Sequence, residues 1–386
     1  MHMNAINAAF LPDVIAMFKA KGWGVINVED AYSDPIYAHV PHVLPAGESR
    51  LWSIAKEQGA TDLRYPAEDG PYEQADLDAL ESAASSTAGR SLVVTIDDLP
   101  YASPPAGDKL AAAKRTTEAL LRTLRAHRVP AIGFVTEGKL QRAGEVDARE
   151  ALLKQWVAAG MLLGNHTFSH PHFSTTSVDT FEDEIVRGDV FTRRLMKARQ
   201  PYQLYFRHPF TETGDTREKK EAVERFLAAR SYKVTPHTID SNDYMFLPAY
   251  ADAKAKHDSA GVRRVREAYL TFLAATTDFA EAMTPRVFGR DIPQTLLIHA
   301  NEVEADNLDD VLKLYVARGY RFISLDEAMA DPAYQTPDTL VTRYGPSWLW
   351  RWSRSLGQDI SFRADPEPPD WIMKAYKSVW IQQAVP

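Results

Sequence analysis

The chain has 386 residues, 45% hydrophobic and 25% charged, which excludes a disordered, collagenous or coiled-coil protein. Its formal net charge of -8 makes a nucleic-acid partner unfavourable, and no local basic patch stands out along the sequence. The absence of cysteine excludes thiol catalysis, thiolate metal sites and disulfides. No apolar run approaches the roughly 20 residues that span a bilayer, so we expect no membrane span. Residues 1–18 also lack the basic and apolar regions of a signal peptide.

The beginning of the chain repeats a segment near its end. Residues 1–37 align without gaps on residues 298–334, with identities that include Gly22 opposite Gly319, where the pattern predicts that a helix stops. We therefore predict that residues 1–65 form a βαβ-like partial copy of the C-terminal module. Such a remnant must bury an apolar face, which favours packing or a homo-oligomer over a second active site.

Beyond an acidic linker predicted over residues 66–88, strands and helices alternate. This order is typical of an α/β fold with largely parallel strands. The predicted strands are 91–96, 130–135, 161–164, 202–206, 232–236, 294–299 and 320–324, and the predicted helices between the first six are 108–127, 148–159, 181–199, 217–230 and 262–282. We expect residues 89–335 to form one barrel-like domain.

A tryptophan-rich extension, residues 336–386, is predicted to pack on this barrel. Its tryptophans permit two interpretations: a platform on which sugars stack, or a cap on the core. They are Trp348, Trp350, Trp352 and Trp371.

Polar residues follow the first and third of these strands. Asp97 and Asp98 stand at the end of the first, and His166 and His170 lie four residues apart after the third. Histidines at this spacing can chelate one divalent ion or serve a structural role, and Pro171 favours a loop rather than a helix for them. The carboxyl ends of parallel strands usually carry the active groups of α/β proteins.

Further polar residues lie at the ends of later strands. Arg207 follows 202–206, Asp240 and Asp243 lie at or just beyond another strand, and His299 ends the strand 294–299. Together with the first two clusters they make a structural coincidence improbable.

These residues resemble the motifs of the polysaccharide deacetylase family, which is the NodB-homology family or carbohydrate esterase family 4. Its motifs T-F-D-D, H-[ST]-x-x-H, R-x-P-[YF], D-x-x-D-W and L-x-H are similar, in the same order, to five segments that begin at Thr95, His166, Arg207, Asp240 and Leu297. The resemblance implies a distorted (β/α) barrel. It departs from the family pattern at Tyr244, which replaces the usual Trp, and at the His-Ala-Asn after the fifth motif.

The resemblance also implies a metal site and a base. Asp98, His166 and His170 would hold a divalent metal, most simply Zn²⁺, with Co²⁺ or Ni²⁺ as alternatives. Asp97 would act as general base on the water that the metal binds, and Arg207 would hold Asp97 in place.

On the other side of the site, the family pattern implies an acid. His299 would protonate the leaving amine, and Asp243 would orient the His299 ring and keep it protonated. Asp240 is the alternative for this orienting role, but a structural role is favoured for it. Pro209, Phe210 and Tyr244 would bind substrate, and a backbone N–H near Phe210 would help to stabilise the oxyanion.

The function predicted from this resemblance is metal-dependent hydrolysis of N- or O-acetyl groups of a carbohydrate, with the water on the metal as nucleophile. The alternatives are hydrolysis of a cyclic amide or imide, or a non-catalytic carbohydrate-binding homologue. The predicted partner is an acetylated carbohydrate. The family resemblance favours an exported protein, although the sequence has no visible signal peptide.

Overall fold

The computed structural model describes residues 15–16, 18–23, 89–103, 107–197, 199 and 203–383. The chain divides into two compact units, Met1–Glu73 and Gln74–Pro386. In the first unit a short helical stretch is described, and Gly22 after it has a φ of 80°, close to the 79° of Gly319. The rest of the predicted N-terminal repeat and of the linker lies outside the described residues, so that these assignments stay predictions.

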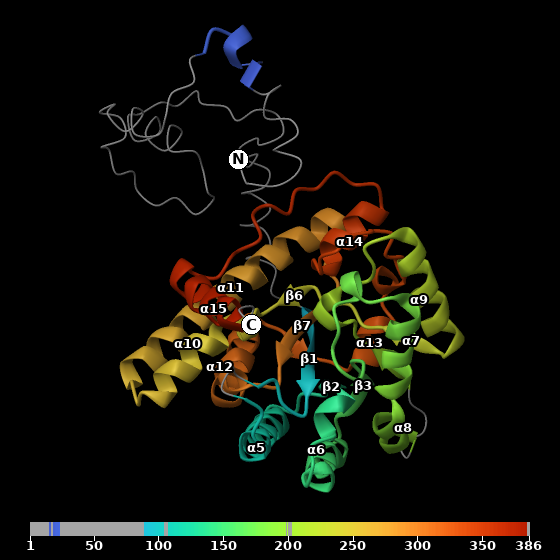
Figure 1. The fold of residues 1–386 in the computed structure, drawn as a ribbon, viewed down its shortest axis with the longest axis vertical. Helices are drawn as coiled ribbons and strands as arrows, with labels where there is room; N and C mark the ends of the chain where they lie inside the picture. Colours follow the sequence, from blue (N-terminus) through green and yellow to red (C-terminus); the bar gives the residue numbers. More distant parts are fainter. Residues whose placement is uncertain are drawn as a thin grey trace. The chain divides into compact units, whose positions relative to one another are not determined.

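A parallel sheet forms the centre of the second unit (Figure 1). Seven of its eight strands follow the order β5-β4-β3-β2-β1-β7-β6, and β8 pairs with β1. Within the described part of the chain the edge strands β5 and β6 do not pair, so the curled sheet stays open on one side. The predicted α/β fold with a distorted barrel is thus confirmed. The strands are β1 (Ser91–Leu99), β2 (Ile132–Val135), β3 (Leu162–Asn165), β4 (Leu204–Phe206), β5 (Tyr232–Val234), β6 (Ile239–Asp240), β7 (Gln294–His299) and β8 (Arg321–Phe322).

The central strand β1 is apolar and β-branched, and its first seven residues are buried, as expected for a parallel strand covered on both faces. It extends past the predicted end at Ile96 because its pairing with β7 continues to Asp97, which lies opposite His299. The sheet register therefore brings two predicted site residues together on adjacent strands.

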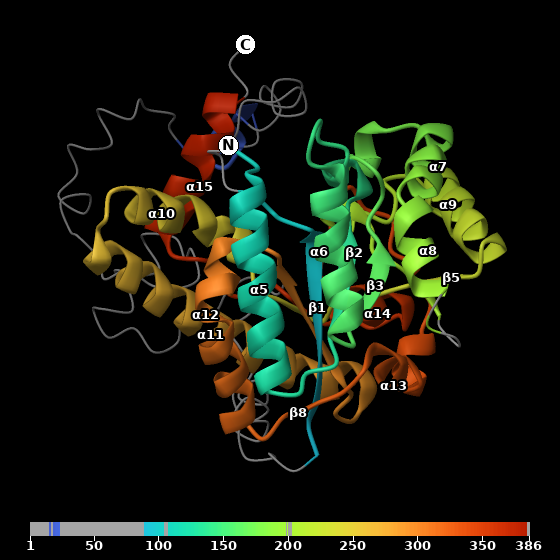
Figure 2. The same ribbon diagram turned by 90° about the horizontal axis from the view of Figure 1, so that it is seen from below.

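Helices cover the outside of the sheet. Figure 2 shows α5 and α6 side by side with α12 next to α5, and contacts between the elements agree with this order. The helices are α5 (Leu110–Ala126), α6 (Val146–Ala158), α7 (Val178–Arg187), α8 (Val190–Lys197), α9 (Arg217–Ala229), α10 (Asp243–Ala255), α11 (Ser259–Phe288), α12 (Glu302–Ala317), α13 (Leu325–Met329), α14 (Trp348–Ser355) and α15 (Asp370–Gln383), with 3-10 turns at Glu137–Leu140, Phe173–Thr175, Pro209–Thr211 and Pro332–Gln335.

The helix predicted over residues 181–199 is wrong in its extent, because the structure has two helices, α7 and α8, separated at Gly188. A Cβ atom at Gly188 would lie 2.3 Å from the backbone carbon of Thr167. The chain thus comes into close contact with the loop between His166 and His170, and only glycine fits there. Helix α10, which contains Pro248, was not predicted.

The C-terminal segment buries two of its tryptophans. Trp348 and Trp352 are 4% and 1% exposed, and the Trp352 ring packs edge-on against Phe288 and Tyr334. This burial favours the core-cap interpretation for these two residues over a sugar platform. None of the helices in the described ranges combines the length and the apolar character that crossing a bilayer requires.

Candidate active site

The carboxyl edge of the sheet collects the polar residues that the sequence singled out. Asp97 and Asp98 are among the last three residues of β1, His299 ends β7, and the loop after β3 carries His166 and His170. Arg207 follows β4 directly. The expected loop around Pro171 is present, with His170 in the left-handed region at a φ of 61°.

Three of these side chains form a group that can hold a metal ion. One ligand atom from each of Asp98, His166 and His170 lies within 4.8 Å of the others, and this is the one such group among the described residues. The His170 Nε2 atom is 4.0 Å from the Asp98 Oδ1 atom. Two imidazoles and one carboxylate form a ligand set that suits zinc and related ions.

The two imidazoles of this group are neutral. His166 donates a hydrogen bond from Nδ1 to the Arg207 carbonyl at 2.8 Å, which leaves the Nε2 lone pair available. Burial outweighs the attraction of the Asp98 carboxylate and lowers the pKa of His166 to about 4. Burial likewise lowers the pKa of His170 to about 3. Both residues therefore present unprotonated nitrogens at neutral pH.

Asp98 has a cationic partner that the sequence did not reveal. The Lys139 Nζ atom lies 2.7 Å from Asp98 Oδ1, and the Thr136 hydroxyl donates to the same oxygen at 3.2 Å. Burial opposes ionisation, but Lys139 and the histidines outweigh it and hold the pKa of Asp98 well below its ordinary value. Lys139 comes from the 3-10 turn after β2, and nothing in its sequence context indicates a role at this site.

Asp97 is buried beside the ligand group, and one of its carboxylate oxygens accepts no hydrogen bond from the described residues. Its Oδ1 atom has no hydrogen-bond partner among the described residues, and its Oδ2 atom lies 3.7 Å from His166 Nε2. The Arg207 Nη1 atom is 3.9 Å from Oδ2, which is a long ion pair rather than a hydrogen bond. Burial raises the pKa of Asp97 although Arg207 acts in the opposite direction. Arg207 itself donates from Nη2 to the Thr95 hydroxyl at 2.9 Å.

His299 faces the site from the neighbouring strand with Asp243 behind it. Its Nδ1 atom donates to Asp243 Oδ1 at 2.6 Å, and its backbone N–H donates to Oδ2 at 2.9 Å. Asn301, whose role the sequence did not reveal, donates to Oδ2 at 2.8 Å, and the Tyr244 N–H donates to Oδ1 at 2.9 Å. Burial disfavours the charged imidazole, but Asp243 and the Asp97–Asp98 pair outweigh it and raise the pKa of His299 to about 10. The other candidate, Asp240, accepts a hydrogen bond from the Asn242 N–H instead.

The predicted substrate-binding residues lie at the rim. Phe210 is 38% exposed, packs against the His170 ring at 4.5 Å and stacks on His172 at 3.6 Å between ring centroids. Pro209 beside it is buried. Tyr244 packs edge-on against His299 at 5.4 Å and against Tyr376 of α15 at 5.7 Å. The C-terminal helix thus contributes to the surroundings of the residue that departs from the family motif.

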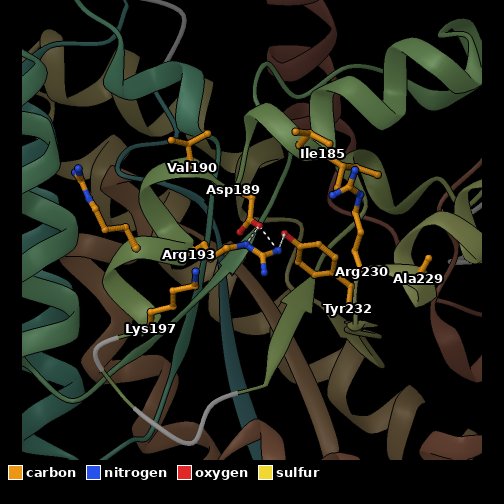
Figure 3. Close-up of a pocket in the computed structure, with 10 residues that line it drawn as sticks. Ile185, Asp189, Val190, Arg193, Lys197, Ala229, Arg230 and Tyr232 are labelled. Carbon is orange, nitrogen blue, oxygen red and sulfur yellow. Dashed lines mark hydrogen bonds and ion pairs between the residues drawn. The ribbon is translucent and has the colours of Figure 1, made fainter.

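A separate cavity lies away from the proposed site residues. It measures about 590 Å³ between α7, α8 and the region of Ala229 to Tyr232, and none of the predicted site residues lines it. Figure 3 shows the Arg193 side chain between Asp189 and Tyr232. Three further basic residues line this cavity, namely Arg194, Lys197 and Arg230. The sequence did not reveal this basic cluster, because Arg230 is distant along the chain and joins the others only in the folded protein.

Comparison with known proteins confirms the family resemblance. The family model described as polysaccharide deacetylase matches residues 84–225. This range contains the first three motifs, whereas Asp243 and His299 lie beyond it.

Several individual proteins are similar to parts of the chain. An uncharacterized 30.6 kDa protein of Geobacillus stearothermophilus is 26% identical over 223 residues, which are 57% of this chain and 68% of that protein. Among solved structures, the polysaccharide deacetylase Bc1974 of Bacillus cereus is 18% identical, with a TM-score of 0.41 over 63% of this chain and 95% of that one. A family 4 carbohydrate esterase of Streptomyces lividans, in complex with acetate, is 19% identical, with a TM-score of 0.37 over 60% and 91%. BA3943 of Bacillus anthracis, a family 4 pseudoenzyme, is 17% identical, with a TM-score of 0.38 over 63% and 66%.

Proposed function

We propose that this chain, whose residues 84–225 match the polysaccharide deacetylase family, is a metal-dependent hydrolase that removes N- or O-acetyl groups from a carbohydrate polymer or oligosaccharide. The observation that best supports this is the meeting of three kinds of group at one sheet edge. They are a ligand set, a buried carboxylate with an unused oxygen, and a histidine paired with a carboxylate. Each of these groups can contribute to amide or ester hydrolysis.

The ligand set fits a divalent ion with open positions. Asp98, His166 and His170 would supply three donor atoms, and the neutral state of both imidazoles suits this role. When bound there, Zn²⁺ or a similar ion such as Co²⁺ or Ni²⁺ polarises the acetyl carbonyl and makes a water molecule more acidic.

Asp97 is the proposed general base. It accepts the proton that the water loses as the water oxygen adds to the carbonyl carbon, and its free Oδ1 lone pair is the acceptor available for this. Its raised pKa, caused by burial, makes it a stronger base than an exposed aspartate. Arg207 and Thr95 act as positioning residues behind it.

His299 is the proposed general acid. The leaving nitrogen takes a proton from the His299 Nε2 atom as the carbon–nitrogen bond breaks, so that acetate and a free amine are released. For an acetyl ester the leaving oxygen takes the proton instead. Asp243 fixes the Nδ1–H of His299, which leaves Nε2 to point toward the substrate side, and it stabilises the charged form.

The experiment that tests this proposal is acetate release from a panel of acetylated saccharides and one cyclic imide, with and without a chelator. We expect release that the chelator abolishes and that added metal restores. Asp97→Asn should retain the metal and lower the rate by about 100-fold or more, in line with general-base contributions. Asp183→Asn, on the exposed face of α7, is the matched control and should leave the rate unchanged.

Two results would contradict the proposal. Turnover of the cyclic imide alone would favour the amide or imide hydrolase alternative. Saccharide binding without turnover of any substrate in the metal-loaded protein would favour a non-catalytic binding protein.

A further inference from the structure

The cavity between α7, α8 and the turn from α9 to β5 carries an excess of positive charge. Its volume of about 590 Å³ lies within the range of about 300–1,000 Å³ that small-molecule sites occupy. Ten residues line it, four of them cationic and one anionic, whereas the whole chain has a formal net charge of -8. A local concentration of cations in an acidic protein favours an anionic ligand. The charged residues of this basic cavity are Asp189, Arg193, Arg194, Lys197 and Arg230.

The inner wall of the basic cavity is held in place by hydrogen bonds. Arg193 pairs with Asp189 and donates to the Tyr232 hydroxyl at 3.4 Å (Figure 3). The same hydroxyl accepts a hydrogen bond from the Asn165 side-chain amide at 3.0 Å. Asp189 is 7% exposed and is paired with Arg193, so the exposed charge of the cavity comes from the other three cations. A wall that is ordered without a ligand lowers the entropic cost of binding one.

Arg230 contributes a guanidinium group that the protein itself does not use. The group lies over the Phe226 ring, 4.5 Å from the centroid, and it makes no side-chain hydrogen bond or ion pair with the residues that the structure describes. Asp189 and Glu182 act on it only through longer-range electrostatic interaction. The ring restricts the side chain and leaves its five N–H donors available. An arginine held in this way suits bidentate binding of a carboxylate or phosphate.

Helix α8 contributes the other exposed cations. The Arg194 Nη2 atom lies 3.5 Å from Glu150 Oε2, which is long for a charge-assisted hydrogen bond, and the side chain is 67% exposed. Lys197 follows three residues later on the same helix. Cations at this spacing repel one another, and an anion between them removes that cost. Interaction with the helix ends favours cations here in any case, but it does not account for a cavity between cations of two helices.

Apolar residues of the lining narrow the class of ligand. Val190 and Val186 are 71% and 41% exposed, and Val190 is the most exposed large apolar side chain among the described residues. Ile185 and Ala229 also line the cavity. An inorganic ion gains nothing from this surface, whereas a carbon skeleton would cover it and remove it from water. The lining therefore fits an organic anion better than a free ion.

We propose that the basic cavity binds a small organic anion that carries two or more phosphate or carboxylate groups. One acidic group would pair with Arg230 and another with Arg194 and Lys197, while the carbon skeleton covers the two exposed valines. This inference goes beyond the proposed function, because none of the proposed catalytic or metal-ligand residues lines the cavity. It does not depend on acetate release.

The test is a calorimetric titration of the full chain with fructose 1,6-bisphosphate and with tricarballylate, a tricarboxylate. Fructose and inorganic phosphate are the ligand controls, since one lacks the charge and the other lacks the carbon skeleton. Arg230→Gln and Arg194→Gln each remove one exposed cation of the cavity. Arg225→Gln is the matched control, because Arg225 is a 72% exposed residue of α9 that does not line the cavity.

We expect at least one of the two polyanions to bind about tenfold more tightly than inorganic phosphate, and fructose not to bind. Arg230→Gln and Arg194→Gln should each weaken polyanion binding by about 5- to 20-fold, whereas Arg225→Gln should match the unmodified chain. Added salt should weaken binding as well, because the cations are exposed. Tighter binding of the bisphosphate would assign phosphate as the recognised group, and tighter binding of the tricarboxylate would assign carboxylate.

Three results would overturn the inference. The first is that neither polyanion binds. The second is that both bind and that neither variant weakens them, which would place the anion elsewhere, for example at the metal-ligand group. The third is that inorganic phosphate binds as tightly as the polyanions, which would mean that the carbon skeleton is not recognised. Thermal unfolding of the variants completes the test, since a lower melting temperature with unchanged binding would show that these cations only stabilise the helix ends.

Discussion

The proposed site contains histidines in two regions, and they differ in protonation: the imidazoles of one region are neutral and the imidazole of the other is charged. In the loop after β3, burial lowers the pKa of His166 and His170 to about 4 and about 3. At the end of β7, His299 is also largely buried, yet its pKa is raised to about 10. Between His166 and His299 the main difference is the partner of Nδ1, since His166 donates to a backbone carbonyl and His299 to the Asp243 carboxylate.

This comparison shows how one side-chain type can serve two chemical purposes within one site. A neutral partner leaves burial dominant, so the imidazole stays unprotonated and can be a metal ligand. A buried carboxylate reverses the balance, so the imidazole is charged and can donate a proton. The following changes would break or sharpen this contrast, from the largest expected effect to the smallest.

Removing a neutral imidazole should have the largest effect. His166→Ala deletes one of three ligand atoms, so we expect loss of bound metal and a fall in acetate release of at least about 1,000-fold. His127→Ala is the control, because His127 follows α5 outside the ligand group and pairs with the exposed Asp309. Metal content by mass spectrometry or absorption checks this prediction. Full metal stoichiometry in His166→Ala would refute the ligand assignment.

Replacing the carboxylate behind His299 should remove its charge. Asp243→Asn eliminates the main cause of the raised pKa of His299. The His299 imidazolium then loses its proton at a lower pH, so the alkaline limb of the kcat profile should move toward neutral pH. We expect kcat at pH 7 to fall by about 100-fold, with the metal retained. Asn301→Ala, which removes one donor but keeps the His299–Asp243 pair, should change kcat much less. Identical pH profiles for Asp243→Asn and the unmodified chain would remove Asp243 from this role.

The same pair makes a prediction about stability. The folded-state pKa of His299 lies above the ordinary value of about 6.5, so its pairing stabilises the folded protein fully below that pH. The stabilisation is lost as the pH rises through about 10. Denaturant unfolding of the metal-free chain between pH 7 and 10 should show a decline that Asp243→Asn lacks.

Lys139 allows a milder change on the metal side. Its ammonium group and a divalent ion compete for the Asp98 carboxylate, so Lys139→Met should tighten Zn²⁺ binding by about tenfold, which corresponds to about 1.4 kcal/mol. Chelator competition measures the affinity, and Lys154→Met, on an exposed lysine of α6, is the control. Weaker binding in Lys139→Met would mean that the lysine positions Asp98 for the metal instead.

The smallest expected effect is a weak dependence of metal binding on pH. The pKa values of His166 and His170 are about 4 and about 3, so both imidazoles are unprotonated above pH 5. Protons therefore do not compete with the metal for their nitrogen atoms in this range. Zn²⁺ affinity should therefore change by less than about threefold between pH 7 and 5.5. Two imidazoles with ordinary pKa values near 6.5 would lower the metal affinity by roughly 70-fold over this range. A loss of that size would show that the two side chains are not desolvated as the structure has them.

The alternating order of strands and helices could be read from the sequence because each element has its own periodicity. β1 was predicted because its residues are apolar and β-branched, and the helices because their apolar residues recur on one face. The break at Gly188 could not be predicted, because its cause is contact with the backbone of Thr167, a residue of another element. Helix α10 escaped prediction because its Pro248 is an unfavourable residue inside a helix.

The sequence by itself determined which chemical groups are present and at which strand ends they stand. The residue types of the five motifs, and the rule that parallel strands end at one edge, were sufficient for Asp97, Asp98, His166, His170 and His299 to be proposed as one site. Only the tertiary structure decided the charge on each group and its unexpected neighbours. Lys139, Asn301 and the basic cavity depend on sheet register and on the packing of loops and helices. Burial and electrostatic interactions act through space, so residues distant in the sequence set the protonation of each site residue.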